Sequence, residues 1–209
     1  MQALERSNPT LEMKPEKTEC SEFEYIRHGT QCLTANLEVA TGKIISPTVA
    51  DTRKEDDFVE HISKTIETDK DAGWIFILDQ LNTHKSASLV EFVAKTCQID
   101  EELGEKGISG VLKTMEDRQK FLENPEHRIR FVYTPKHCSW LNQVEIFFSK
   151  LAKRILIRGN FTSKEDLKGK TLRFIEKHNT QTKPYKWNCD AEKIVEKIKT
   201  ALDSIGSGI

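Results

Sequence analysis

The apolar positions of this chain fall into short runs and helical stripes that predict a mixed α/β fold. Residues 23–28 and 32–39 are rich in β-branched and aromatic side chains, and with residues 43–45 they predict a meander of strands. Residues 74–78 are continuously apolar, which is typical of a central strand covered on both faces. Residues 129–133 predict a further short strand.

Polar capping residues followed by apolar positions at helical spacing predict the helices. Helices are expected to begin near Thr52, Ser88, Ser139 and Thr162, and an amphipathic helix is expected within residues 188–209. The helix that begins near Ser139 carries one apolar stripe: Trp140, Val144, Phe147, Leu151 and Ile155.

The pattern predicts one main domain with two appendages. Residues 1–22 are polar and without periodicity, so an extended lead-in is expected there. Residues 23–187 form the α/β domain, in which residues 100–127 are expected to be a surface insertion with a short helix. Residues 188–209 add the C-terminal helix and tail.

Composition supports a globular protein of the reducing cytosol. Hydrophobic residues make up 37% of the chain and charged residues 31%. The five cysteines are scattered and include no Cys-x-x-Cys pair, which favours free thiols over disulfides or a zinc site. No apolar run approaches the roughly 20 residues that span a bilayer, so no membrane partner is expected.

The net charge of −1 hides a strong asymmetry along the chain. Residues 127–187 hold 14 Lys and Arg against 4 Asp and Glu, an excess of ten positive charges. Such a surface is suited to a polyanion, because phosphates give sequence-independent affinity to clustered cations. A solvated basic face with no partner would have the same composition, and charge alone leaves both interpretations open.

Two acidic residues stand in apolar surroundings where burial disfavours charge. Asp79 directly follows the apolar run 74–78, and Glu145 ends the segment WLNQVE at residues 140–145. If the two carboxylates converge at the edge of a buried sheet, they form a hard-oxygen site for Mg²⁺ or Mn²⁺, ions used in phosphodiester chemistry.

The segments around these acids resemble a known family. ILDQLNTHKS at residues 77–86 resembles the second-aspartate segment of DDE-type transposases of the mariner-like bacterial insertion-sequence group. YTPKHCSWLNQVE at residues 133–145 is similar to the third-carboxylate segment of the same group, and it is the most specific match. FEYIRHGT at 23–30 and KPYKW at 183–187 also match, so the resemblance covers roughly residues 1–187.

The resemblance implies a ribonuclease H-like fold, a mixed sheet flanked by helices, in which three acids hold two divalent metals. It makes Asp79 the second acid and Glu145 the third. In the family the first aspartate lies on the opening strand, just before a segment that resembles QALER at residues 2–6. Met1 stands directly before that segment, so the first strand and its acid are expected to be missing.

The function implied is that of a transposase catalytic domain, a DDE superfamily endonuclease for metal-dependent DNA cleavage and strand transfer in DNA integration. Without the first acid the chain is expected to be inactive alone. The cofactor is Mg²⁺ or Mn²⁺, held by Asp79 and Glu145, and the implied location is the bacterial cytoplasm, with the nucleoid. DNA contacts are expected from a set of basic residues near Glu145: Lys136, His137, Lys150, Lys153, Arg154 and Arg158.

The implied partners are transposon ends and target DNA, with a homodimer and a complementing N-terminal fragment left open. One alternative function is a non-catalytic nucleic-acid-binding remnant of a transposase. A third interpretation, an unrelated hydrolase that uses Asp79 and His84, leaves the Glu145 segment unexplained.

Overall fold

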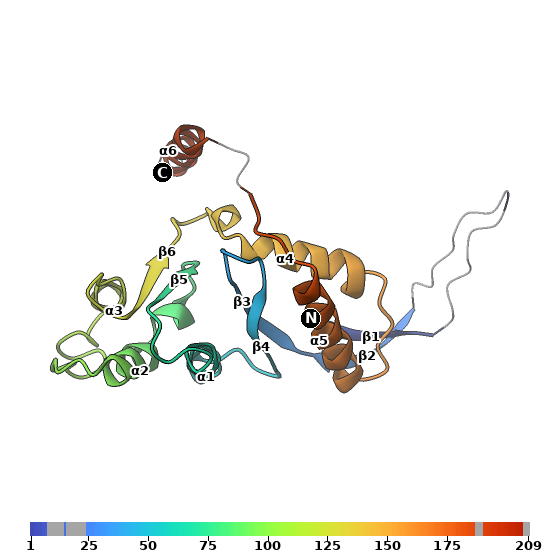
Figure 1. Ribbon diagram of the computed structural model, residues 1–209, viewed down its shortest axis with the longest axis horizontal. Coiled ribbons are helices and arrows are strands. Elements are labelled where there is room, and N and C mark those ends of the chain that lie inside the picture. Colours follow the sequence, from blue (N-terminus) through green and yellow to red (C-terminus); the bar gives the residue numbers. More distant parts are fainter. Residues whose placement is uncertain (8–14, 16–23, 187–189, 207–209) are drawn as a thin grey trace.

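The computed structural model describes residues 1–7, 15, 24–186 and 190–206. The described chain is elongated, with one group of elements at each end and strands β3 and β4 between them (Figure 1). In the described part of the chain, no helix is long and apolar enough to cross a membrane.

The strands form small sheets. Their bounds are β1 (Gln2–Arg6), β2 (Tyr25–Thr30), β3 (Cys32–Leu37), β4 (Ile44–Ala50), β5 (Trp74–Leu78) and β6 (Ile129–Tyr133). Strands β1 and β2 pair antiparallel, as do β3 and β4, whereas β5 and β6 run parallel with Trp74 opposite Ile129. The expected α/β class is confirmed, but the described strands form three two-stranded sheets in place of one mixed sheet.

The helices follow and separate these strands. Their bounds are α1 (Glu55–Ile66), α2 (Ala87–Cys97), α3 (Met115–Leu122), α4 (Val144–Leu151), α5 (Lys164–Thr180) and α6 (Ala191–Gly206). Short 3₁₀ turns cover Asn82–Lys85 and Ser139–Leu141, and a π-helical turn over Ala152–Leu156 continues α4.

Two main hydrophobic clusters hold the two ends of the molecule. The first packs α1, α2 and α3 against β5 and β6, with Phe131 and Leu122 fully buried. The second joins α4 and α5 to β3 and β4 through Ile44, Phe147 and Ile175. The segment that follows β5 therefore belongs to the first cluster, and α4 belongs to the second.

The region expected to be an extended lead-in contains a strand. Residues 2–6 form β1, which pairs with β2 and is not a loose extension. The meander of strands is also different, because β2 and β3 follow one another with only Gln31 between them and pair with different partners. Parts of the expected lead-in and tail lie outside the described residues, namely those that fall on residues 8–14, 16–23, 187–189 and 207–209.

The helix expected from Ser139 begins later than its sequence pattern indicates. Ser139 opens a 3₁₀ turn, Asn142 has extended backbone with ψ of 107°, and α4 starts at Val144. Trp140 therefore does not join the apolar stripe, and 45% of its surface is exposed. Phe147 and Leu151 occupy the buried face as expected.

The segment expected as a surface insertion does contain a short helix, α3, but it also contributes to the core. Thr114 caps α3 by accepting a hydrogen bond from the backbone N–H of Asp117. Leu112, Phe121 and Leu122 are buried in the first cluster. Burial of these apolar side chains fixes the segment against α2.

Candidate functional site

A groove with a volume of about 700 Å³ separates β3 from β5. Strand β3 lines it with residues 32–37 and β5 with residues 74–78, and β4, α1, the loop after Asp79 and the start of α4 also contribute to its walls. Asp79 and Glu145 both line this groove. The two acids singled out in the sequence therefore share one cavity, although 66 positions separate them.

Asp79 occupies the first position after β5, where the chain leaves the sheet. Its carboxylate is half exposed, and Oδ1 accepts a hydrogen bond of 3.1 Å from the backbone N–H of Leu81. The same oxygen lies 2.8 Å from Nδ1 of His84, a close contact without good hydrogen-bond alignment. These two neighbours fix the carboxylate at the mouth of the groove.

His84 is the closest side-chain neighbour of Asp79. Its imidazole packs on the ring of Phe58 with centroids 4.3 Å apart. Burial lowers the pKa of His84, and the nearby Asp79 carboxylate opposes this effect only in part. The imidazole is therefore neutral at neutral pH and presents a dipole, not a full charge, to Asp79.

The loop after Asp79 is tied to the end of β6. Tyr133 donates its hydroxyl to the carbonyl oxygen of His84 at 2.7 Å, and Gln80 donates to the carbonyl of Thr134 at 2.6 Å. Burial of the Tyr133 hydroxyl raises its pKa, so this donor stays protonated. Such bonds hold Asp79 in place before any ligand binds.

Sequence reasoning missed Lys85, which anchors the same loop. Its ammonium is buried, bonds to Gln80 and to Gln119, and lies 4.7 Å from the centre of the Tyr133 ring. Burial lowers the pKa of Lys85, and the charge of Glu123 opposes this effect only in part. The sequence feature that could have indicated this role is the position of Lys85 just before an apolar helix, because a lysine buried there needs hydrogen-bond acceptors.

Glu145 lies in the first turn of α4, and its side chain is exposed. Among the described residues its carboxylate has no hydrogen bond or ion pair, so it is available to a ligand. The partial positive charge of the helix N-terminus favours an anionic side chain there. Phe147 and Leu151, both buried in the second cluster, fix the helix that carries it.

The other acids of the groove are already engaged. Asp57 accepts hydrogen bonds from the backbone N–H of Lys54 and from Thr52. Glu60 pairs with Lys64 one helical turn away, and Glu38 accepts from Thr41. Among the described residues that line the groove, Glu145 is thus unpaired, and Asp79 is engaged through Oδ1 by a backbone N–H and an imidazole but by no cation.

This donor set is chemically suited to Mg²⁺ or Mn²⁺, which take carboxylate oxygens and keep several waters. Asp79 is half exposed and Glu145 is exposed, so each carboxylate is accessible to solvent. Three or more His, Cys, Asp or Glu side chains do not gather anywhere in the described chain in a way that could hold a metal. The described site thus offers two accessible carboxylates, those of Asp79 and Glu145.

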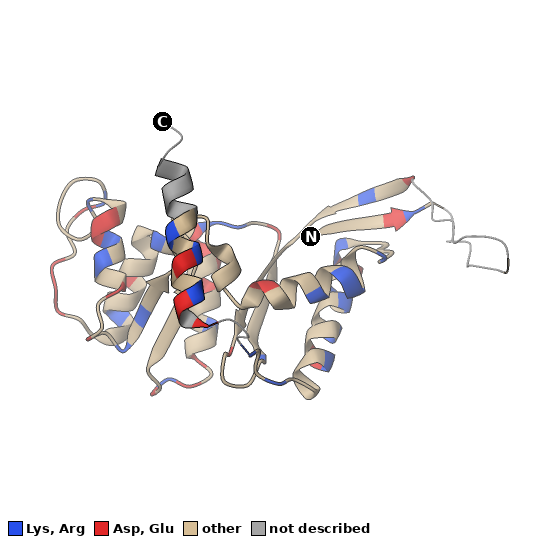
Figure 2. Ribbon diagram, turned by 90° about the horizontal axis from the view of Figure 1, so that it is seen from above, with Lys and Arg blue, Asp and Glu red and all other residues tan. Residues whose placement is uncertain are grey.

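The basic residues expected to contact DNA lie on either side of Glu145. Lys136 and His137 are exposed in the loop after β6, and His137 has a φ of 62°, the left-handed region that favours glycine. Lys153, Arg154 and Arg158 are exposed on and after the π-helical turn. Figure 2 shows Lys and Arg gathered on the helices at this end of the molecule.

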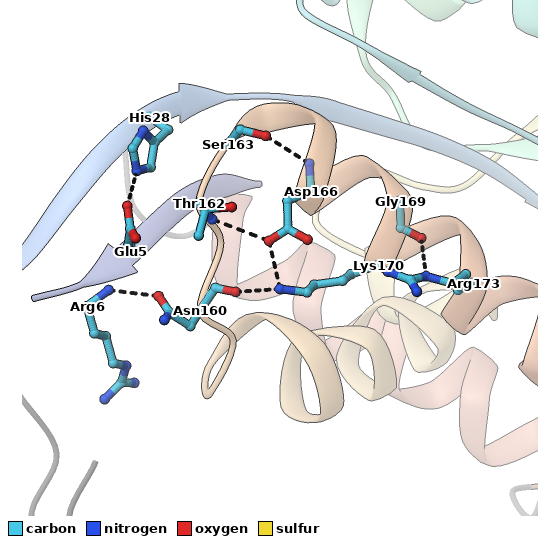
Figure 3. Close-up of polar contacts among 10 residues, drawn as sticks. All are labelled: Glu5, Arg6, His28, Asn160, Thr162, Ser163, Asp166, Gly169, Lys170 and Arg173. Carbon is cyan, nitrogen blue, oxygen red and sulfur yellow. Dashed lines mark hydrogen bonds and ion pairs between the residues drawn. The ribbon is translucent and has the colours of Figure 1, made fainter. Parts of the chain in front are cut away.

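Some cations in this region are engaged in structural contacts. Nζ of Lys150 lies 3.2 Å from Nδ1 of His178 on α5. Lys170 donates to the carboxylate of Asp166 and to the backbone carbonyl of Asn160, and the side-chain Oδ1 of Asn160 accepts from the backbone N–H of Arg6 (Figure 3). These contacts engage Lys150 and Lys170. Lys153, Arg154 and Arg158 are therefore better placed to bind a phosphate.

Comparison with known protein families gives one match, to the family described as DDE superfamily endonuclease, over residues 4–168. This range includes the end of β1, strands β2 to β6, both acids singled out in the groove and the basic residues that follow Glu145. No curated protein and no solved structure matches the chain.

Proposed function

Because this chain belongs to the DDE superfamily endonuclease family, we propose that the groove between β3 and β5 is the catalytic end of a transposase domain that cleaves DNA. The observation that carries the proposal is that Asp79 and Glu145 line one groove, where Glu145 is unpaired among the described residues and Asp79 contacts a backbone N–H and an imidazole through Oδ1 alone. Their chemistry fits phosphodiester cleavage, which needs acidic ligands for divalent ions.

Asp79 and Glu145 would hold the Mg²⁺ or Mn²⁺. When bound, such an ion polarises the phosphodiester and lowers the pKa of a water molecule. His84 and the backbone N–H of Leu81 hold the Asp79 carboxylate in its orientation. The helix α4 holds Glu145 toward the groove from the other side.

The finer assignment follows the segments quoted above: a mariner-like bacterial insertion-sequence transposase with a ribonuclease H-like catalytic domain over residues 23–187. Two carboxylates supply less charge and fewer oxygens than a two-metal centre uses. We therefore expect weak cleavage from this chain alone.

Lys153, Arg154 and Arg158 would bind the DNA backbone beside the groove. All three are exposed; Lys153 and Arg154 follow Glu145 on the helix that the π-helical turn continues, and Arg158 lies just beyond its end. Phosphate contacts of this kind position DNA without reading its sequence. The same observation favours a second candidate function, a DNA-binding remnant of a transposase without catalysis.

Plasmid nicking tests the proposal. Purified protein is incubated with supercoiled plasmid and Mn²⁺, and open-circle product is measured for the wild type, Asp79→Asn and Glu145→Gln. Glu60→Gln is the matched control, because it removes a groove carboxylate that pairs with Lys64.

We expect slow, metal-dependent nicking that both site variants reduce by at least about 100-fold and that the control retains. Absence of nicking together with salt-dependent plasmid binding would favour the DNA-binding remnant. Nicking that survives in both site variants would contradict the catalytic assignment of Asp79 and Glu145.

A further inference from the structure

Helix α3 is connected to the loop that follows Asp79 through the side chain of Lys85. The helix packs against the 3₁₀ turn Asn82–Lys85, at the same end of the molecule as β5 and β6 (Figure 1). The ammonium of Lys85 donates to the side-chain oxygen of Gln119 on α3 at 2.7 Å, and it also donates to the side-chain oxygen of Gln80. Because Gln80 directly follows Asp79 in the chain, these bonds link α3 to the neighbour of a proposed metal ligand.

The ammonium of Lys85 determines how each carboxamide is oriented. A lysine ammonium only donates hydrogen bonds, so Gln80 and Gln119 both turn their oxygen atoms toward Lys85. Their NH₂ groups then point away from it: Gln80 donates to the carbonyl of Thr134 at 2.6 Å, and Gln119 donates to the carboxylate of Glu123 at 3.0 Å. The bonds therefore form one continuous chain from α3 to the residue that follows β6.

The chain of hydrogen bonds leaves Lys85 few alternatives. Lys85 is buried, with 6% of its surface exposed, and among the described residues its ammonium bonds to Gln80 and Gln119 alone. A buried ammonium that loses an acceptor keeps a donor without a partner, which costs more than an ordinary hydrogen bond contributes. Loss of the Gln119 oxygen therefore favours movement of Lys85, and such movement releases Gln80.

The segments that lead to both proposed metal ligands meet at this chain of hydrogen bonds. Gln80 comes directly after Asp79, and Thr134 begins the segment that leads from β6 to Glu145. The backbone N–H of Thr134 also donates to the carbonyl of Leu78 at 2.8 Å. A shift of Gln80 relative to Thr134 would therefore change the position of Asp79 at the end of β5.

We infer that Gln119 of α3 acts through Lys85 as a positioning residue for Asp79. The inference rests on the proposed function, because that function gives the position of Asp79 its importance. Gln119 is not among the described residues that line the groove, so it acts on Asp79 only through these contacts. Residues 100–127, expected as a surface insertion, then support the site from behind the loop that follows Asp79.

Hydrogen exchange of the Leu81 amide tests this inference, because the N–H of Leu81 donates to Oδ1 of Asp79. The variant Gln119→Met retains the approximate size of the side chain and removes the oxygen that accepts from Lys85. The conservative variant Gln119→Glu retains an oxygen acceptor for the ammonium. Exchange rates of the Leu81 amide are measured in both variants and in the wild type.

Two controls separate a local effect from a loss of overall stability. The variant Lys120→Met changes the next residue of α3, which is exposed and pairs with Glu116 on the same helix. The amide of Val93, a fully buried residue within α2, reports global unfolding.

We expect the Leu81 amide to exchange at least about 10-fold faster in Gln119→Met than in the wild type, with little change at Val93. Gln119→Glu and Lys120→Met should remain within about threefold of the wild type. An unchanged Leu81 rate in Gln119→Met would overturn the inference. Equal acceleration at Leu81 and Val93 would also overturn it, because Gln119 would then only stabilise the fold.

This readout needs neither metal nor DNA, so failure of the inference is distinguishable from failure of the proposed nuclease function. Absence of Mn²⁺ binding by the wild type would contradict the proposed function, and the Leu81 exchange rates would still decide the role of Gln119.

Discussion

At the scale of single residues, the sequence singled out Asp79 and Glu145 because acids are rare in apolar surroundings, yet the structure leaves Asp79 half exposed and Glu145 exposed. It did not identify what holds them. The contacts of Asp79 with His84 and of His84 with Tyr133 join residues from the β5 and β6 ends, and such pairs depend on the parallel register of the two strands. A local pattern contains no information about that register.

His84 is expected to act as a positioning residue for Asp79. Replacing it by Ala removes the group 2.8 Å from the Asp79 carboxylate, and we expect Mn²⁺ affinity to fall about 10-fold, as for other groups that orient metal ligands. Calorimetric titration with Mn²⁺ measures this. His84→Asn retains a donor and should recover part of the affinity, whereas equal losses in both variants would indicate a merely structural role.

His61 should make folding stability sensitive to acid. It is fully buried, and burial lowers its pKa from 6.5 to about 4. The unfolded chain therefore takes up a proton near pH 6.5, whereas the folded chain resists protonation until about pH 4. Stability from this residue is complete above pH 6.5 and falls by about 3 kcal/mol as the pH drops through that window.

Urea unfolding at several pH values measures the effect of His61. The variant His61→Gln, which does not titrate, should show a flatter dependence of the free energy of unfolding between pH 6.5 and 4. An unchanged slope in the variant would assign the acid sensitivity to other groups.

At the scale of elements, capping signals placed most helices to within a few residues. Helix α1 begins at Glu55 and α2 at Ala87, but their caps are Lys54 and Ser86, not Thr52 and Ser88. Ser163 does cap α5, as the pattern near Thr162 indicated. Several polar residues lie close together at each start, and tertiary packing decides which one becomes the cap.

The basic helix after Glu145 is expected to bind DNA through phosphates. Replacing Lys153, Arg154 and Arg158 by Ala should flatten the plot of log affinity against log salt by up to about 3 units if all three contact phosphates. Fluorescence anisotropy with a random duplex measures the slope. Lys95, Lys113 and Lys120, exposed at the other end of the molecule, form the control triple variant. Equal slopes for the two triple variants would contradict the proposed DNA surface.

At the scale of the whole molecule, the sequence predicted the α/β class but not the division of its strands. Residues 74–78 are apolar throughout, as for a strand covered on both faces, yet Ile75 and Ile77 are exposed to the groove. An apolar run indicates that a strand needs apolar neighbours on both faces. It does not indicate which elements provide those neighbours.

The central claim is that Asp79, which follows β5, and Glu145, in the first turn of α4, act together on one ion. Calorimetric Mn²⁺ titration of the wild type, Asp79→Asn, Glu145→Gln and the double variant tests it most directly. We expect each single change to weaken binding by at least about 10-fold, and the double variant to bind no more weakly than the weaker single, because loss of either ligand disrupts the shared site. Unchanged affinity in Glu145→Gln, or losses that add independently, would contradict the claim.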